Sequence, residues 1–278
     1  KVNDRYKTLE PLLEGSKPVK EIAVLHSADS VWSKAPLKPK FKWTFTPAYY
    51  SVNGVHKALV DLHRQVGVLN STVCVDTLKN YRALVISDQR ILGEPEVSAI
   101  RAFVKKGGAL IVTHASGVRD AANRELPDFA LADVLGVRFR GMAGVSSCYL
   151  RAQPELRKYG IPMMDVEAGG DYTRIETVTA KKLLDLVPPC RGLKNGPPDT
   201  APGGPGVTIN TYGDGKALYC APDLFGAFFD KATPNMRKIA AWMLDTVYPG
   251  ASAFTTLENA PVSVELFFNE RGNERFVH

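Results

Sequence analysis

The sequence predicts an α/β fold: a doubly wound, mostly parallel sheet with helices on both faces. Three observations lead to this prediction. Short apolar runs, each as long as a buried strand, alternate with segments of helical periodicity. Two of these runs end in polar residues, as strands do at the edge where such sheets bind ligands. A diglycine, Gly107–Gly108, ends a helix-like segment directly before the run ALIVTHAS.

The first half of the chain carries the clearest elements. The run EIAVLHS is continuously apolar, which is typical of a strand buried on both faces. The segment EPEVSAIRAFVKKGG has glutamates in its first turn and lysines in its last, in agreement with a helix dipole. The elements predicted here are a strand at 21–27, a helix at 51–68, strands at 66–76 and 83–88, a helix at 94–108 and a strand at 109–116. This order is flavodoxin-like.

The second half is more weakly patterned. Its best feature is a hairpin, with two alternating strands about Gly213-Asp214-Gly215. Thr233 before Pro234 predicts the start of a helix that continues to Val247. The other predicted elements are a short helix and edge strand in 127–141, a strand at 176–180, an irregular loop at 184–206 and a C-terminal hairpin about Arg271-Gly272-Asn273.

Three segments organise the chain. Residues 1–19 are polar and resemble a linker or an arriving helix from an upstream domain, 20–250 form the α/β domain, and 251–278 begin a C-terminal β-domain. The chain starts with Lys1 and stops in a strand-like sequence, so we expect a piece of a longer protein. No apolar run reaches the roughly 18 residues that a membrane span needs. The sequence does not indicate a compartment.

Polar residues follow three of the predicted strands. Because parallel strands end at the same edge, right-handed crossovers would bring these residues into one crevice. The candidate crevice residues are His26, Asp88, Arg90, His114, Ser116 and Asp120.

The crevice residues match three kinds of site only in part. THASG resembles a nucleophile elbow around Ser116, but His114 stands where that motif needs Gly. His26, Asp88 and His114 are metal-ligand types, yet their separations match no ligand motif, and no metal is expected. Glycoside hydrolysis needs two carboxylic acids, and no pair stands out. The available acids are Asp88, Asp120, Asp165, Glu167, Asp171 and Asp223. No catalytic residue is assigned, and hydrogen-bonded strand ends remain the default interpretation.

The segment 28–50 is expected to be a long loop rich in proline, lysine and aromatic residues. Loops of this length in compact domains are usually functional or bind partners. We therefore take its aromatic side chains as a candidate subunit interface, with local packing over the sheet edge as the alternative. The candidate interface residues are Trp32, Trp43, Tyr49 and Tyr50.

Charge and cysteine content exclude other classes. The net charge of +6 is spread along the chain without an aromatic-interleaved basic stripe, so no nucleic-acid partner is expected. Cys74, Cys148, Cys190 and Cys220 form no CxxC pair, so neither a zinc site nor a disulfide framework is indicated. No cofactor and no membrane partner are expected.

Several of these segments, in this order, resemble one known family. They are EIAVLHS, YYSVNGVHKALVDLH, YRALVISDQRIL, VKKGGALIVTHASGVRD, LADVLGVRFRG and GDGKALYCAPD. Residues 20–278 are similar to the class I glutamine amidotransferase-like domain, called the trimerisation domain, of family 42 β-galactosidases and related glycoside hydrolases. There it follows a catalytic barrel and precedes a β-sandwich.

The resemblance implies a non-catalytic domain that forms homo-oligomers, trimers in this family, and shapes the active site of a catalytic barrel in the same parent chain. Glutamine amidotransferases use a Cys in a Gly-rich elbow, which neither Cys74 nor Cys148 matches. The sugar-cleaving carboxylates of the family belong to the barrel and cannot be carried over. A second interpretation is a small-molecule, sugar-binding or hydrolytic protein acting at the crevice, because trehalose-utilisation-type proteins also place a His after the diglycine strand.

Overall fold

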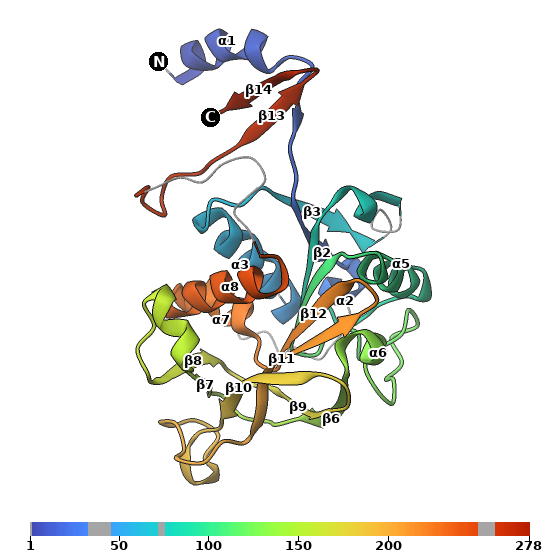
Figure 1. The fold of residues 1–278 in the computed structure, drawn as a ribbon, viewed down its shortest axis with the longest axis vertical. Coiled ribbons are helices and arrows are strands. Elements are labelled where there is room, and N and C mark those ends of the chain that lie inside the picture. The colour runs from blue at the N-terminus through green and yellow to red at the C-terminus, as the bar shows by residue number, and fades with distance from the viewer. Residues whose placement is uncertain (1, 33–45, 72–75, 250–258) are drawn as a thin grey trace.

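A nine-stranded mixed sheet forms the centre of the molecule (Figure 1). The computed structural model describes residues 2–32, 46–71, 76–249 and 259–278. The strand order is β3-β2-β4-β5-β12-β11-β10-β7-β8. The parallel half consists of β3 (Val66–Asn70), β2 (Ile22–His26), β4 (Ala83–Ser87), β5 (Ala109–Thr113) and β12 (Gly215–Cys220). The antiparallel half adds β11 (Gly204–Tyr212), β10 (Lys181–Val187), β7 (Cys148–Arg151) and β8 (Asp165–Gly169).

The prediction of a mostly parallel, doubly wound sheet is wrong. Among the described strands four pairings are parallel and seven are antiparallel. Parallel neighbours need a crossover of a dozen or more residues, usually a helix. Between β6 (Val137–Met142) and β12 the strands are joined by turns and two short 3₁₀ segments, η2 (Pro154–Tyr159) and η3 (Cys190–Gly192), so antiparallel pairing prevails.

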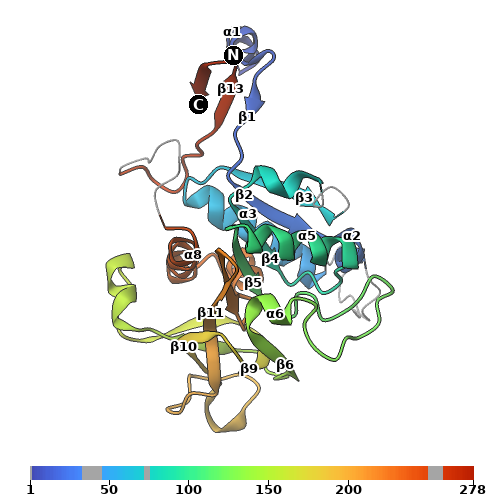
Figure 2. The ribbon, with the colours of Figure 1, turned by 45° about the vertical axis from the view of Figure 1, so that its right-hand side comes forward.

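Helices cover both faces of the parallel half, and Figures 1 and 2 show α8 and α5 on opposite sides of it. One face carries α3 (Pro47–Asp61), α7 (Leu224–Lys231) and α8 (Pro234–Val247). The other carries α5 (Glu94–Lys105), α6 (Ala132–Leu135) and the two-stranded sheet of β6 and β9 (Thr173–Thr177). The 3₁₀ segment η1 (Leu78–Asn80) precedes β4. No helix in the described ranges has both the length and the apolar character to cross a membrane.

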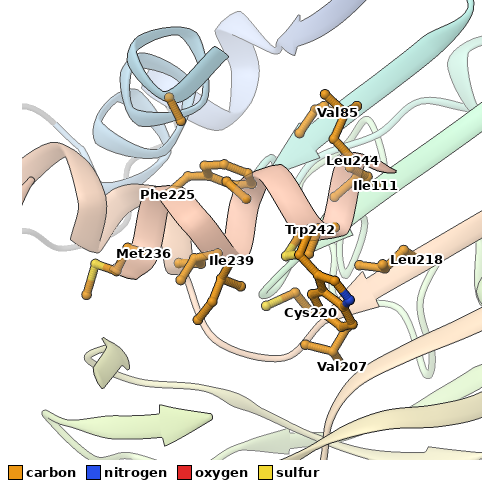
Figure 3. Packing of buried hydrophobic residues seen from close by; sticks show 14 of the residues in the cluster. Val85, Ile111, Val207, Leu218, Cys220, Phe225, Met236, Ile239, Trp242 and Leu244 are labelled. Atoms are coloured by element: carbon orange, nitrogen blue, oxygen red, sulfur yellow. The ribbon is translucent and has the colours of Figure 1, made fainter. Parts of the chain in front are cut away.

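The core is divided by the sheet into two clusters. Successive side chains of a strand point to opposite faces, so Ile22 and Val24 join the cluster under α8 while Ala23 and Leu25 join the other. Figure 3 shows Trp242 of α8 over the strand residues Cys220 and Val207. Burial on both faces explains why these strands read as unbroken apolar runs.

The two ends of the described chain meet in a small separate sheet. Here β1 (Lys17–Pro18) pairs antiparallel with β13 (Phe268–Arg271), which pairs with β14 (Glu274–Val277). The β13–β14 pair is the hairpin predicted about residues 271–273. The N-terminal segment predicted as a linker contains α1 (Val2–Leu13), and Figure 2 shows both termini at the same end of the molecule.

The segment 28–50 differs from the predicted long loop. Residues Ala28–Trp32 form α2, and the amide of Ser30 donates to Ser27 Oγ at its start. Thr46 caps α3, which begins at Pro47, four residues earlier than predicted. Residues 33–45 lie outside the described part of the chain. These helices begin with side-chain caps, and α3 also has a proline in its first turn. The sequence prediction gave more importance to the aromatic residues of the segment than to these signals.

Candidate functional site at the strand ends

Strands β4 and β5 deliver Asp88 and His114 to neighbouring positions. Ser87 and Thr113 are in register at the last pair of these parallel strands, and their hydroxyl oxygens lie 2.7 Å apart. The next residues, Asp88 and His114, both have left-handed backbone, with φ of 46° and 52°. This conformation is costly for residues other than glycine and tends to occur at functional sites. It turns both side chains out of the strand direction at the carboxyl edge.

Asp88 forms a buried ion pair with His114. His114 Nδ1 lies 2.8 Å from Asp88 Oδ1, and the Asp88 side chain is fully buried. Arg90 donates from Nε to the same carboxylate oxygen at 3.1 Å, with its guanidinium half-exposed. Tyr219 OH donates to the carbonyl oxygen of His114 at 2.7 Å, which fixes the backbone below the ring. The ion pair is therefore buried, while Arg90 beside it is partly exposed.

Asp223 is the second carboxylate at this point. It follows β12 and is the N-cap of α7, where Oδ1 accepts from the amide of Gly226 at 3.0 Å. Ser51 Oγ of α3 lies 2.8 Å from Oδ2 and 2.9 Å from Oδ1. One donor atom from each of Asp88, His114 and Asp223 lies within 4.8 Å of the other two. Three neighbouring parallel strands thus contribute one titratable side chain each, and we call them the Asp-His-Asp cluster.

The electrostatics of the cluster follow from burial and mutual charge. Burial alone would raise the pKa of Asp88, but the charge and hydrogen bond of His114, with a contribution from Arg90, hold it below its ordinary value. Burial would lower the pKa of His114, yet Asp88 and then Asp223 raise it. Burial and the nearby Asp88 charge raise the pKa of Asp223. The ion pair of Asp88⁻ with His114⁺ is therefore the favoured state.

Stability should depend on pH through this pair. A raised His pKa stabilises the folded state fully below the ordinary value of 6.5, and this contribution is lost as pH rises through the folded pKa. The lowered pKa of Asp88 stabilises the folded state above pH 3.8, and this stabilisation is lost on acidification. The pair therefore adds most to the free energy of unfolding between pH 3.8 and pH 6.5. We expect His114→Gln to reduce the free energy of unfolding more at about pH 6 than at about pH 9. Urea titrations in chelator-containing buffer measure this, and an equal loss at both pH values contradicts it.

The structure brings together only part of the predicted crevice. Asp88, Arg90 and His114 are in direct contact. His26 ends β2, and in the part of the chain that the structure describes no hydrogen bond joins it to this group. Asp120 lies further along the loop, where it binds Arg124 and the amide of Ala122. Hydrogen bonds to that turn and the Arg124 charge lower the pKa of Asp120.

Ser116 is a structural residue in this arrangement. Its hydroxyl donates to the carbonyl oxygen of Thr113 at 2.8 Å and accepts from the amide of Gln89 at 3.2 Å. His114 directs Nδ1 to Asp88, so neither partner of Ser116 is a base. This geometry does not support the nucleophile-elbow hypothesis, since a nucleophilic Ser needs a general base within hydrogen-bond reach.

Thiol chemistry is also unsupported. Burial raises the pKa of the Cys148 thiol well above its ordinary value, and burial with the nearby Asp223 charge raises that of Cys220. Cys190 is a free, half-buried cysteine, and Cys74 lies outside the described residues. Neither of the two buried thiols, Cys148 and Cys220, therefore has the lowered pKa of a nucleophilic thiolate.

The aromatic interface candidates are only partly described. Trp32 ends α2 with 77% of its surface exposed, and Trp43 lies outside the described residues. Tyr49 and Tyr50, in the first turn of α3, are half-buried with ring centroids 6.3 Å apart. Tyr50 also packs on Phe229 of α7, at 5.5 Å.

The sequence prediction missed two residues of the site. Asp223 is among the available acids named above but not among the crevice candidates, and Ser51 is in neither set. The available signal was the position of Asp223, directly after the buried strand ALYC and before a helix. Recognising it requires knowing that β12 pairs in parallel with β5, so that Cys220 is in register with Thr113.

Known proteins show the same fold. A family model described as the β-galactosidase trimerisation domain matches residues 20–241. The chain belongs to this family. The resemblance inferred from the sequence is thereby confirmed. No curated protein sequence matches the chain significantly.

Solved structures similar to this trimerisation domain are glycoside hydrolases. The β-galactosidase from Bacillus circulans sp. alkalophilus gives a TM-score of 0.76 at 16% identity, covering 99% of this chain and 37% of that chain. A GH42 β-galactosidase from G. stearothermophilus gives 0.75 at 16% identity, covering 99% and 36%. The α-L-fucosidase isoenzyme 2 from Paenibacillus thiaminolyticus gives 0.73 at 15% identity, covering 97% and 38%. At such identities the likeness shows the fold, and the chain spans less than two fifths of each of these proteins.

Proposed function

We propose that this trimerisation domain is a non-catalytic assembly domain of a glycoside hydrolase with a β-galactosidase-like parent. It associates with two further copies of itself and shapes the active site of a catalytic barrel in the same parent chain. The family match over residues 20–241 is the observation that carries the proposal. The bonding of Ser116 to backbone groups and the raised pKa values of the Cys148 and Cys220 thiols support a non-catalytic role.

The surface that we propose for self-association lies around α2 and the start of α3. Trp32 exposes 77% of its surface, and Phe229, which packs on Tyr50, exposes 36%. Large aromatic side chains are enriched at the centres of protein interfaces and dominate their energetics. α2 also contacts α3, so Trp32 and Tyr50 come from neighbouring elements. A second copy of the chain is the partner that the family description favours.

Self-association can be measured on the chain itself. We expect light scattering after size exclusion to show a concentration-dependent oligomer, with a trimer as its end point. Trp32→Ser should weaken association by about tenfold or more, the effect of losing an interface anchor worth over about 1.4 kcal/mol.

Val178→Ser is the matched control, because Val178 is also an exposed apolar residue, at 56%, but directly follows β9 of the separate two-stranded sheet. It should leave the oligomer unchanged. A strict monomer at high concentration, in this chain and in its full-length parent, contradicts the assembly role. Equal weakening by both variants would place the interface elsewhere.

The second interpretation, a sugar-binding or hydrolytic protein acting at the crevice, has less support. His114 is 5% exposed, so its ring is not available to a ligand of sugar size. Ligand sites of that size are clefts of about 300–1,000 Å³. A cavity of about 270 Å³ lies beside Arg90, but its walls come from the following loop and β6 and do not include the Asp-His-Asp cluster.

A further inference from the structure

We propose that Asp88, His114 and Asp223 together bind a divalent transition-metal ion. One donor atom from each lies within 4.8 Å of the others, and the cluster draws on three neighbouring strand ends. Two carboxylates and an imidazole suit zinc, manganese or ferrous iron. Three protein ligands leave a coordination position for water or another oxygen ligand. This inference rests on the chain's own residues and does not depend on its oligomeric state.

The His114 ring supplies an independent reason. Its Nδ1 contacts Asp88, while Nε2 is buried and has no hydrogen-bond partner in the described residues. Leaving a buried polar atom unsatisfied costs about 1–3 kcal/mol. A metal ion, or a water molecule bound to it, can supply the missing interaction.

The spacing of the donor atoms requires little rearrangement. One ligand atom from each of the three side chains lies within 4.8 Å of the other two, so small side-chain movements would bring all three to one ion. Asp223 is fixed by neutral donors alone, Ser51 Oγ and the Gly226 amide, so its negative charge is not neutralised by them. A divalent ion that displaces the proton of His114 would provide both carboxylates with a cationic partner.

Arg90 is the internal competitor for this site. Its guanidinium contacts Asp88 and is 38% exposed, so it can leave for solvent when a metal ion neutralises the carboxylates. Removing its charge should favour a divalent cation, because like charges at this distance repel. The proposal therefore predicts that removing the Arg90 charge tightens metal binding, whereas removing a ligand such as His114 or Asp223 weakens it. A purely structural ion pair predicts no effect of Arg90 on metal affinity.

The test uses residues 1–278, treated with a chelator and then titrated with Zn²⁺ by calorimetry. We expect one ion per chain. His114→Ala and Asp223→Asn should each weaken binding at least about tenfold. Arg90→Gln should tighten it severalfold, and Asp120→Asn, a carboxylate on the same loop bonded to Arg124, should leave it unchanged. Circular dichroism establishes that each variant is folded.

Co²⁺ then identifies the ligands. Its absorption spectrum should show bound cobalt without a sulfur-to-metal charge-transfer band, which excludes the cysteines as ligands. Absence of stoichiometric zinc binding in the unaltered chain overturns the proposal. So does binding that survives His114→Ala and Asp223→Asn, or that shows the sulfur band. If His114→Ala and Asp223→Asn do not fold, Arg90→Gln provides the test. An unchanged zinc affinity of Arg90→Gln then contradicts a metal site at the Asp-His-Asp cluster.

Discussion

Replacing Asp88 with Ala should lower the free energy of unfolding by about 3–5 kcal/mol near pH 6, the usual cost of removing one partner from a buried ion pair. The variant leaves His114 and Arg90 without their shared carboxylate. It also places Ala in a left-handed conformation, with φ of 46°. Urea denaturation in chelator-containing buffer measures the loss.

Two further variants separate charge from shape at this position. Asp88→Asn should lose less, because Asn can still accept a hydrogen bond and tolerates left-handed backbone. Asp120→Ala serves as a surface counterpart, since Asp120 also binds an arginine but the Arg124 side chain is 79% exposed. It should change stability much less than Asp88→Ala. Equal losses at positions 88 and 120 would show that burial of the Asp88–His114 pair has no energetic importance.

Gly54→Ala should destabilise the domain by a net amount of about 1–3 kcal/mol, although Ala is the better helix former by about 1 kcal/mol. Gly54 lies in α3 where that helix crosses α7, and an added Cβ would stand 1.9 Å from the carbonyl oxygen of Phe225. That neighbour is backbone, so the helices must move apart. The shift would also separate Ser51 of α3 from Asp223 at the start of α7.

Gly170→Ala provides the comparison for Gly54→Ala. The nearest atom to a Cβ at Gly170 is the Ser146 carbonyl oxygen at 3.7 Å, an ordinary contact. Thermal denaturation of the two variants should show a lowered melting temperature only for Gly54→Ala. A stabilised Gly54→Ala protein would mean that α3 and α7 are less tightly fixed than the distance indicates.

The sequence predicted the local elements better than their pairing. Helix α8 has the predicted bounds. Strands β4 and β5, which precede Asp88 and His114, follow one another in the sequence and are also neighbours in the sheet. The sheet as a whole was predicted incorrectly. Strands β7 and β8 are only four and five residues long, and although more and less buried residues alternate along them, such short segments did not indicate an antiparallel extension.

The same reason explains the incomplete site. Asp88, Arg90 and His114 lie within 27 consecutive positions and come from adjacent strands. Asp223 and Ser51 are 172 positions apart and meet only because α3 packs against α7. Such a contact is fixed by tertiary packing, and sequence periodicity describes only which side of an element is apolar.

The pairing of β1 with β13 has a consequence for the order in which the molecule opens. Contact of Lys17 with Glu270 closes a loop that contains the whole nine-stranded sheet. Closing so long a loop costs considerable chain entropy, whereas the ladder that closes it is only two residues long. We therefore expect this small sheet to separate before the α/β body unfolds. Hydrogen exchange at its amides reports that local opening, while the amides of β4 and β5 exchange only on global unfolding.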